Sequence, residues 1–292
     1  MAEHRHEVDA LTGTATTGHE WDGVRELNTP LPRWWLWIFY ATIVWSVGYW
    51  IVYPSWPLVS GYTQGVFGWQ SRHAIVGEMA GLQAIRGPMA IKLAEATLPE
   101  IVNDEQLLAF ARAQARPIFN ENCAACHGSG GGGGKGYPNL NDDDWLWGGK
   151  LADIATTIRH GVRSNDDKTR VGGMPAFGRD GMMKRPDIET VADYVRSIAG
   201  LPVERSADLA AGKKIFADNC ASCHGAAGKG NREIGASDLT DAIWLYGSDK
   251  SAIVDGLWNG RAGVMPAWAS RLDDSTIKAL TVYVHTFGGG EK

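Results

Sequence analysis

The sequence is poor in cysteine, has no surplus of basic residues and contains one long stretch without charge. Its 292 residues include only 4 cysteines, and 33 Asp and Glu residues outnumber 28 Lys and Arg residues. A net charge of −5 argues against a chain that binds nucleic acid through a basic surface. Because 44% of the residues are hydrophobic, the chain can form a core and is neither disordered nor collagen-like.

Charged residues and histidine are absent from residues 34–53, which read WWLWIFYATIVWSVGYWIVY. Twenty residues of helix are about 30 Å long, the thickness of the hydrocarbon core of a bilayer. Trp and Tyr stand at both ends, as in the aromatic belts of membrane helices. The run is too long for the apolar part of a signal peptide, so it predicts a membrane span that stays attached. Arg25 and Arg33 before it, against Arg72 after it, favour an N-terminus on the inner side.

All four cysteines lie in two copies of one pentapeptide, Cys123-Ala-Ala-Cys126-His127 and Cys220-Ala-Ser-Cys223-His224. The pattern C-x-x-C-H is the attachment signature for c-type haem. Two thiols one helical turn apart can each add to a porphyrin vinyl group, and the adjacent imidazole then serves as the proximal iron ligand. A redox dithiol or a Cys₄ zinc site would not explain a histidine directly after both motifs. The sequence therefore predicts two covalently bound haem c groups.

The two motifs belong to an internal repeat. An Ile-Phe pair before each motif, a later Trp, a Met-Pro-Ala segment and an apolar helical face all recur in the same order: Ile118-Phe119 and Ile215-Phe216, Trp145 and Trp244, Met174 and Met265, Ile188 and Ile277, Tyr194 and Tyr283. Such self-similarity is typical of duplicated domains.

On these motifs, residues from about 106 to 290 resemble two class I cytochrome c domains in tandem. The whole layout resembles the dihaem subunit of the cbb3-type, or C-family, haem–copper cytochrome oxidases. The resemblance implies a mainly α-helical chain with a polar cytoplasmic tail, a single transmembrane helix, a linker containing an amphipathic helix, and two cytochrome c domains. These parts are expected at residues 1–33, 34–53, 54–105, 106–202 and 203–292.

The resemblance also implies the axial ligands of each haem iron. Met174 and Met265 match the family's axial methionine, so we expect the iron ligands to be His127, His224 and these two methionines. His160 is a competing ligand in the first copy, but it has no counterpart in the second. The sequence leaves open whether each methionine serves the haem of its own copy or that of the other copy.

A backbone carbonyl is expected to orient each proximal imidazole. In this family the carbonyl of the proline at the position of Pro138 typically accepts the imidazole N–H. The second copy has Ser237 there. Since any residue's carbonyl can accept this hydrogen bond, we expect the histidine to ligate iron in both copies. The difference between Pro138 and Ser237 could give the two haems different reduction potentials.

One span and few histidines exclude the oxygen-reducing centre from this chain, so catalysis must lie in another subunit. With both irons six-coordinate, we expect an electron-transfer subunit that is not catalytic alone. The resemblance implies that it belongs to a proton-translocating oxidase. The resemblance implies a donor cytochrome c, a monohaem cytochrome c subunit and a haem–copper catalytic subunit as partners. It also implies a bacterial inner membrane, with a cytoplasmic N-terminus and periplasmic haem domains. Two alternatives stay open: a dihaem peroxidase, which needs a displaceable sixth ligand, and the cytochrome subunit of a different membrane redox complex.

Two further segments carry hypotheses. Apolar residues at helical spacing between 66 and 115 predict an amphipathic helix that lies on the membrane lipid or on a partner subunit. The acidic groups 142–144 and 166–167 are expected to be solvated, and they would also attract a basic donor cytochrome.

Overall fold

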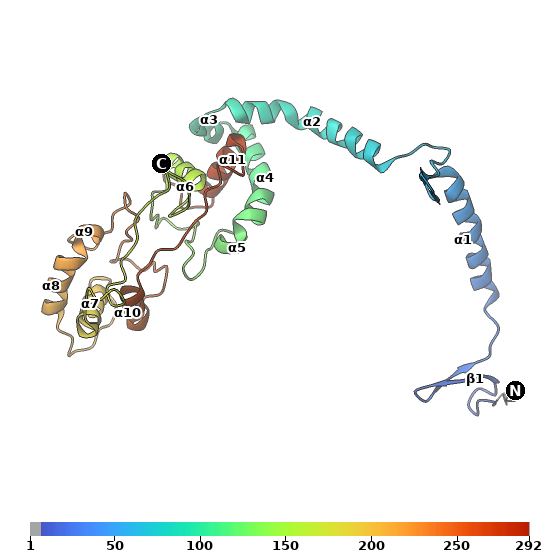
Figure 1. The fold of residues 1–292 in the computed structure, drawn as a ribbon, viewed down its shortest axis with the longest axis horizontal. Helices are drawn as coiled ribbons and strands as arrows, with labels where there is room; N and C mark the ends of the chain where they lie inside the picture. Colours follow the sequence, from blue (N-terminus) through green and yellow to red (C-terminus); the bar gives the residue numbers. More distant parts are fainter. Residues whose placement is uncertain (1–6, 292) are drawn as a thin grey trace. The chain divides into compact units, whose positions relative to one another are not determined.

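A computed structural model describes residues 7–291 of the chain, which divides into two units at Ala84. The described residues are mostly helical, with short strands only in the first unit (Figure 1). This confirms the mainly α-helical fold expected from the sequence.

The first unit contains the expected membrane helix and two small hairpins. Strands β1 (Thr16–Trp21) and β2 (Val24–Leu27) pair antiparallel, and so do β3 (Pro57–Leu58) and β4 (Gly61–Tyr62). Helix α1 (Arg33–Val52) lies between the two hairpins, and none of its residues is buried. It is the one helix of the described residues that is long and apolar enough to cross a membrane, as predicted for residues 34–53.

The predicted amphipathic segment forms three helices rather than one. Helix α2 (Ser71–Glu95) is followed by α3 (Leu98–Asn103) and α4 (Glu105–Asn122). A capping box begins α3, where the Thr97 backbone N–H donates to the Glu100 carboxylate. The Asp104 carboxylate then accepts from Leu107 N at 2.9 Å and begins α4. Polar caps therefore interrupt an apolar pattern that continues through the sequence.

The remaining helices repeat one order. Each repeat has a helix leading into the C-x-x-C-H motif, a one-turn helix that carries the motif, a middle helix and a final helix. In the first repeat α4 is followed by α5 (Ala124–His127), α6 (Leu151–His160) and α7 (Arg185–Ile198). In the second, α8 (Leu209–Asn219) is followed by α9 (Ala221–His224), α10 (Lys250–Asn259) and α11 (Asp274–His285).

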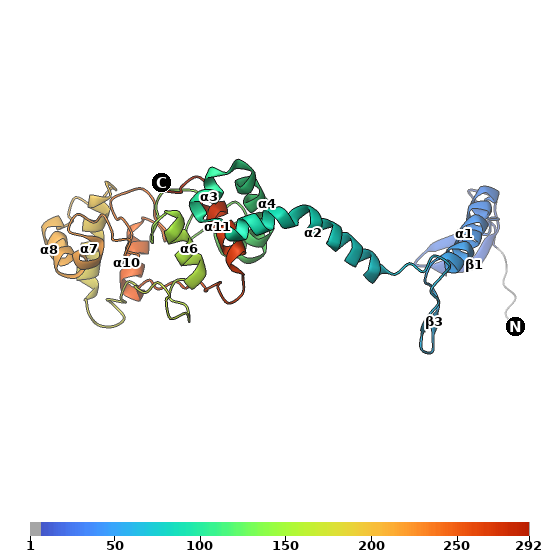
Figure 2. The same ribbon diagram turned by 90° about the horizontal axis from the view of Figure 1, so that it is seen from above.

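The final helices are exchanged between the repeats. Helix α11 packs against α4 and α6, whereas α7 packs against α8 and α10 (Figures 1 and 2). Aromatic pairs mark the same crossing, since the ring of Phe119 lies 5.6 Å from that of Tyr283, and the ring of Phe216 lies 5.5 Å from that of Tyr194. We call α4, α5, α6 and α11 the first core, and α7, α8, α9 and α10 the second core.

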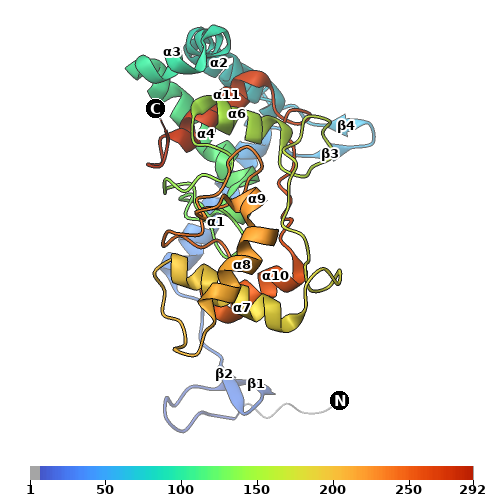
Figure 3. The same cartoon turned by 90° about the vertical axis from the view of Figure 1, so that its left-hand side faces the viewer.

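Small residues let the exchanged helices approach closely. Ala115 on α4 is fully buried in the first core. The corresponding residue of α8 is Gly212, where an added Cβ would lie 2.7 Å from the Cβ of Tyr194 on α7. Figure 3 shows α7, α8 and α10 grouped together, with α4, α6 and α11 forming the other group. Each core thus combines three helices of one repeat with the final helix of the other.

Candidate functional site

The two C-x-x-C-H motifs have the same local structure. Cys123 and Cys220 end the preceding helices with identical backbone angles, φ −114° and ψ −33°. The carbonyl of Cys123 accepts from the backbone N–H groups of Cys126 and His127, and the carbonyl of Cys220 accepts from the corresponding groups in its motif. Each motif therefore holds two thiols and an imidazole within one helical turn, as attachment to both vinyl groups of a haem requires.

The two thiols of each motif differ in burial. Cys123 is half-buried and Cys220 is buried, whereas Cys126 and Cys223 are exposed. Burial, with a smaller effect of the neighbouring thiol, raises the pKa of Cys123 and of Cys220 to about 11. All four are free thiols in the protein chain, so none is used in a disulfide. The inner thiol of each pair stays protonated at neutral pH before haem attachment.

Each motif histidine is oriented by a backbone carbonyl. His127 Nδ1 lies 2.9 Å from Pro138 O, and His224 Nδ1 lies 3.0 Å from Ser237 O. This confirms that a serine carbonyl takes the place of the proline carbonyl in the second repeat. A neutral imidazole that donates from Nδ1 presents the lone pair of Nε2 to a metal. Burial lowers the pKa of His224, which favours this neutral form.

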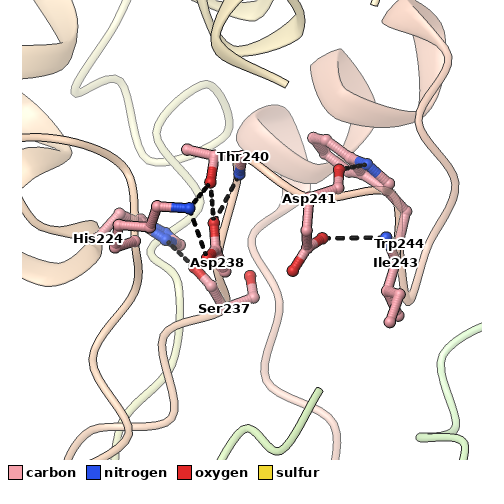
Figure 4. Close-up of polar contacts among 8 residues, drawn as sticks. His224, Ser237, Asp238, Thr240, Asp241, Ile243 and Trp244 are labelled. Carbon is pink, nitrogen blue, oxygen red and sulfur yellow. Dashed lines mark hydrogen bonds and ion pairs between the residues drawn. The ribbon is translucent and has the colours of Figure 1, made fainter. Parts of the chain in front are cut away.

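Local hydrogen bonds hold the loop that carries Ser237 (Figure 4). The Asp238 carboxylate accepts from the backbone N–H of Thr240 at 2.7 Å, and the Asp241 carboxylate accepts from the backbone N–H of Ile243 at 3.0 Å. These are short-range turns of the kind that Asp favours. They fix the carbonyl against which His224 is oriented.

The methionine loops, residues 171–177 and 262–268, cross between the two cores. Met174 packs against the buried residues of the second core, which include Phe216 and Cys220. Met265 packs against those of the first core, which include Phe119. The structure thus brings each predicted methionine together with the haem motif of the other repeat.

Backbone pairing fixes these crossings. Met265 and Val162 exchange two backbone hydrogen bonds of 3.0 Å, and Met174 pairs in the same way with Arg261. Val162 follows the middle helix of the first core, and Arg261 follows that of the second core. The ends of α6 and α10 therefore position the methionine loops.

Two glycines at these helix ends are functional candidates that the sequence analysis did not single out. Gly161 and Gly260 have φ values of 69° and 74°. A Cβ at either position would collide with the carbonyl of Met265 or of Met174. Both glycines directly follow a middle helix, α6 or α10, so an alignment of the two repeats could have identified them.

His160 lies in a different setting from the motif histidines. Its Nδ1 is 2.9 Å from the Asp166 carboxylate, at the end of α6. A backbone hydrogen bond from Lys168 and the contact with His160 lower the pKa of Asp166. The imidazole of His160 is thus hydrogen-bonded to a loop carboxylate and does not contact a C-x-x-C-H motif through this nitrogen.

Acidic residues of the two repeats meet at one depression of the surface. Its lining includes Asp144 from the first repeat and Asp238 and Asp241 from the second, together with Lys229 and Arg232. Burial, followed by repulsion from neighbouring carboxylates, raises the pKa of Asp144 to about 6. Asp144 is therefore not simply solvated, contrary to the expectation for residues 142–144, whereas Asp143 is exposed.

The sequence matches two known families. Residues 13–60 match the N-terminal domain of cytochrome oxidase-cbb3, FixP, and residues 111–195 and 207–284 each match cytochrome C oxidase, cbb3-type, subunit III. Among curated relatives, a cbb3-type cytochrome c oxidase subunit FixP of Bradyrhizobium sp. (strain ORS 278) is 59% identical over 291 residues, 100% of each chain. A subunit CcoP of Azospirillum brasilense is 52% identical and covers 98% of this chain and 99% of its own.

The residues of both motifs fit covalent haem c. Each motif supplies two free thiols within one turn and an imidazole whose Nδ1 is already engaged with a carbonyl. A methionine loop packs into the same core in both cases. Together with the two matched domains, this establishes two covalently bound haem c groups.

Proposed function

The chain belongs to the FixP/CcoP family of cbb3-type cytochrome c oxidase subunits. From this premise we propose how its own residues hold the haems that carry electrons. It is a membrane-anchored dihaem electron-transfer subunit. Our proposal concerns the ligands of the two irons, the partners on either side and the topology of the chain in the membrane.

We propose that each haem is ligated across the repeat boundary. The haem attached to Cys123 and Cys126 takes His127 and Met265, and the haem attached to Cys220 and Cys223 takes His224 and Met174. The packing of Met265 into the first core and of Met174 into the second is the observation that carries this assignment. The ranges 106–202 and 203–292 are then the two copies in the sequence. Each proposed haem site contains residues from both copies.

Six-coordinate irons suit electron transfer. When bound, haem c supplies a one-electron carrier, and imidazole with thioether ligation raises its reduction potential relative to two imidazoles. The chain holds both ligands on packed backbone, with Met174 and Met265 each in a two-bond bridge. A methionine held in this way would occupy the position that peroxide or oxygen needs, so we propose that the chain is not catalytic alone.

The partners follow from this role. With its two haems bound, the chain would take electrons from a donor cytochrome c and deliver them to a monohaem cytochrome c subunit, which would supply the haem–copper subunit of a proton-translocating oxidase. Helix α1 anchors the chain in the bacterial inner membrane, with residues 1–33 cytoplasmic and the haem domains periplasmic. Exposed Asp143 and its acidic neighbours would speed the encounter with a basic donor, an effect that added salt weakens.

Rapid mixing of the purified oxidase with a reduced cytochrome c tests this function. We expect the two haems of this chain to be reduced before the catalytic haems, and to be reoxidised when oxygen is added. A high-spin haem that binds and turns over peroxide in the isolated chain would establish the peroxidase alternative instead. Co-purification with dehydrogenase subunits would place the chain in a different redox complex.

A further inference from the structure

The Arg163 side chain connects the two methionine loops. Its Nε donates to Gly263 O at 2.6 Å, and its Nη1 donates to Gly172 O. Gly263 lies two residues before Met265, and Gly172 lies two residues before Met174. One guanidinium therefore bonds the backbone of both loops at equivalent positions.

The backbone holds Arg163 in an unusual conformation. Its φ is 51°, one of two positive values at non-glycine residues in the part of the chain that the structure describes. An L-residue rarely adopts this region, and a glycine would fit it without strain. The backbone N–H of Arg163 donates to Arg170 O at 2.8 Å, which closes the loop after α6. A strained position occupied by a large residue points to a role for the side chain.

The charge of Arg163 is partly withdrawn from water. The side chain is half-buried, and burial lowers the pKa of its guanidinium. Arginine nevertheless stays charged in proteins at neutral pH. A fixed positive charge in a poorly solvated place acts over a longer range than one on the surface. Beside the two methionine loops, it would favour the reduced state of the irons that these loops are proposed to ligate.

The second repeat does not duplicate this residue. Gly161 corresponds to Gly260 at the equivalent helix ends, so the residue that corresponds to Arg163 is Ala262. The repeat therefore provides two methionine loops but a single arginine for both.

We propose that Arg163 is a shared positioning residue, which sets the methionine ligation and the reduction potential of both haems at once. The inference rests on the proposed crossed ligation. It predicts that a change at one side chain moves two redox centres together, whereas a change in either methionine loop moves one.

A redox titration of the dihaem protein in its complex tests this role. In Arg163→Gln the positive charge is lost, and we expect both haem potentials to fall. A tenfold shift of the oxidised-to-reduced ratio at fixed ambient potential corresponds to about 59 mV for one electron. The far-red absorption band of the ferric iron–methionine bond should weaken at both haems. Arg163→Lys retains the charge and should restore much of both potentials.

Arg196→Gln is the matched control. Arg196 also donates to two loop carbonyls, those of Pro202 and Ser248, but neither loop contains a proposed ligand. We expect this variant to leave both potentials unchanged. The proposal is overturned if Arg163→Gln behaves like the control, or if only one haem responds. Met174→Ala and Met265→Ala, measured alongside, test crossed ligation separately, so either idea can fail without the other.

Discussion

The two cores share their haem motifs but differ in what supports them. In the second core, Lys250 at the start of α10 forms an ion pair with Asp193 on α7. The Nζ atom lies 2.8 Å from the carboxylate. The equivalent residues of the first core are Leu151 and Val282, both part of its hydrophobic cluster. Duplication has thus preserved the C-x-x-C-H motifs and the orientation of their histidines, while the packing of the helices around them has diverged.

The repeated tryptophans differ in the same way. Trp244 Nε1 donates to the nearby Asp241 O, whereas Trp145 Nε1 donates to Gly289 O at 2.6 Å, in the C-terminal segment. Glu291 extends this contact by accepting from Gly149 N and by pairing with Arg232. The C-terminal segment is therefore held to the first core through Trp145 and Glu291, whereas the matching segment of the second core, after α7, is held by Arg196, which donates to Pro202 O and Ser248 O. Different surroundings give two haems of the same ligand type a means to differ in potential.

The largest effect is expected at the two helix-end glycines. Gly161→Ala should displace Met265, and Gly260→Ala should displace Met174, because each Cβ collides with a methionine carbonyl at a positive φ. We expect a loss of about 3 kcal/mol in the free energy of unfolding. The iron–methionine absorption band should weaken by about half in each variant. Gly181→Ala has a similar φ and open space around its Cβ, so it serves as the control for backbone strain alone.

The ion pair of the second core should be the next most sensitive feature. Asp193→Ala leaves Lys250 without its partner, at an expected cost of about 1–2 kcal/mol, reduced by the partial exposure of the lysine. The double variant Asp193→Val with Lys250→Leu copies the residues of the first core. Chemical denaturation should show that it regains the loss. A double variant as unstable as Asp193→Ala would contradict the equivalence of the two positions.

Removal of the tryptophan N–H groups should have a smaller effect, which differs between the two cores. Trp145→Phe and Trp244→Phe each lose one hydrogen bond, worth about 1 kcal/mol. Only Trp145→Phe should loosen the C-terminal segment, because Trp145 holds Gly289. Faster hydrogen exchange at residues 288–291 in that variant, and not in Trp244→Phe, is the expected result.

The smallest effect concerns the pH dependence of stability. Asp144 has a folded pKa of about 6, above its ordinary value of 3.8, so the folded state binds its proton more tightly than the unfolded state. The resulting penalty is absent below about pH 4, grows up to about pH 6 and stays constant above it. Asp144→Asn should therefore stabilise the protein at pH 7, by about 1 kcal/mol after allowance for its partial exposure, and have no effect at pH 4. Thermal unfolding at the two pH values measures the difference.

The sequence predicted the membrane helix and the haem motifs because both are local signals. Twenty uncharged residues and a C-x-x-C-H pentapeptide need no knowledge of the rest of the chain. Caps at Thr97 and Asp104 were missed because an apolar pattern continues across them.

The exchange of helices could not be predicted from the repeat. The apolar faces of α7 and α11 carry equivalent residues, such as Tyr194 and Tyr283, so either helix suits either core. Only three-dimensional packing distinguishes the two arrangements. Arg163 was missed for the opposite reason, because it lacks a repeated counterpart that would draw attention to it.

Crossed ligation is tested most directly by the ferric absorption spectrum of a chain that carries one haem. Cys220→Ala with Cys223→Ala leaves only the haem on the first motif, and the reciprocal variant at Cys123 and Cys126 leaves only the second. In the first background, Met265→Ala should abolish the iron–methionine band and Met174→Ala should retain it. In the reciprocal background the two methionines should exchange roles. Loss of the band on Met174→Ala in the first background would contradict the account.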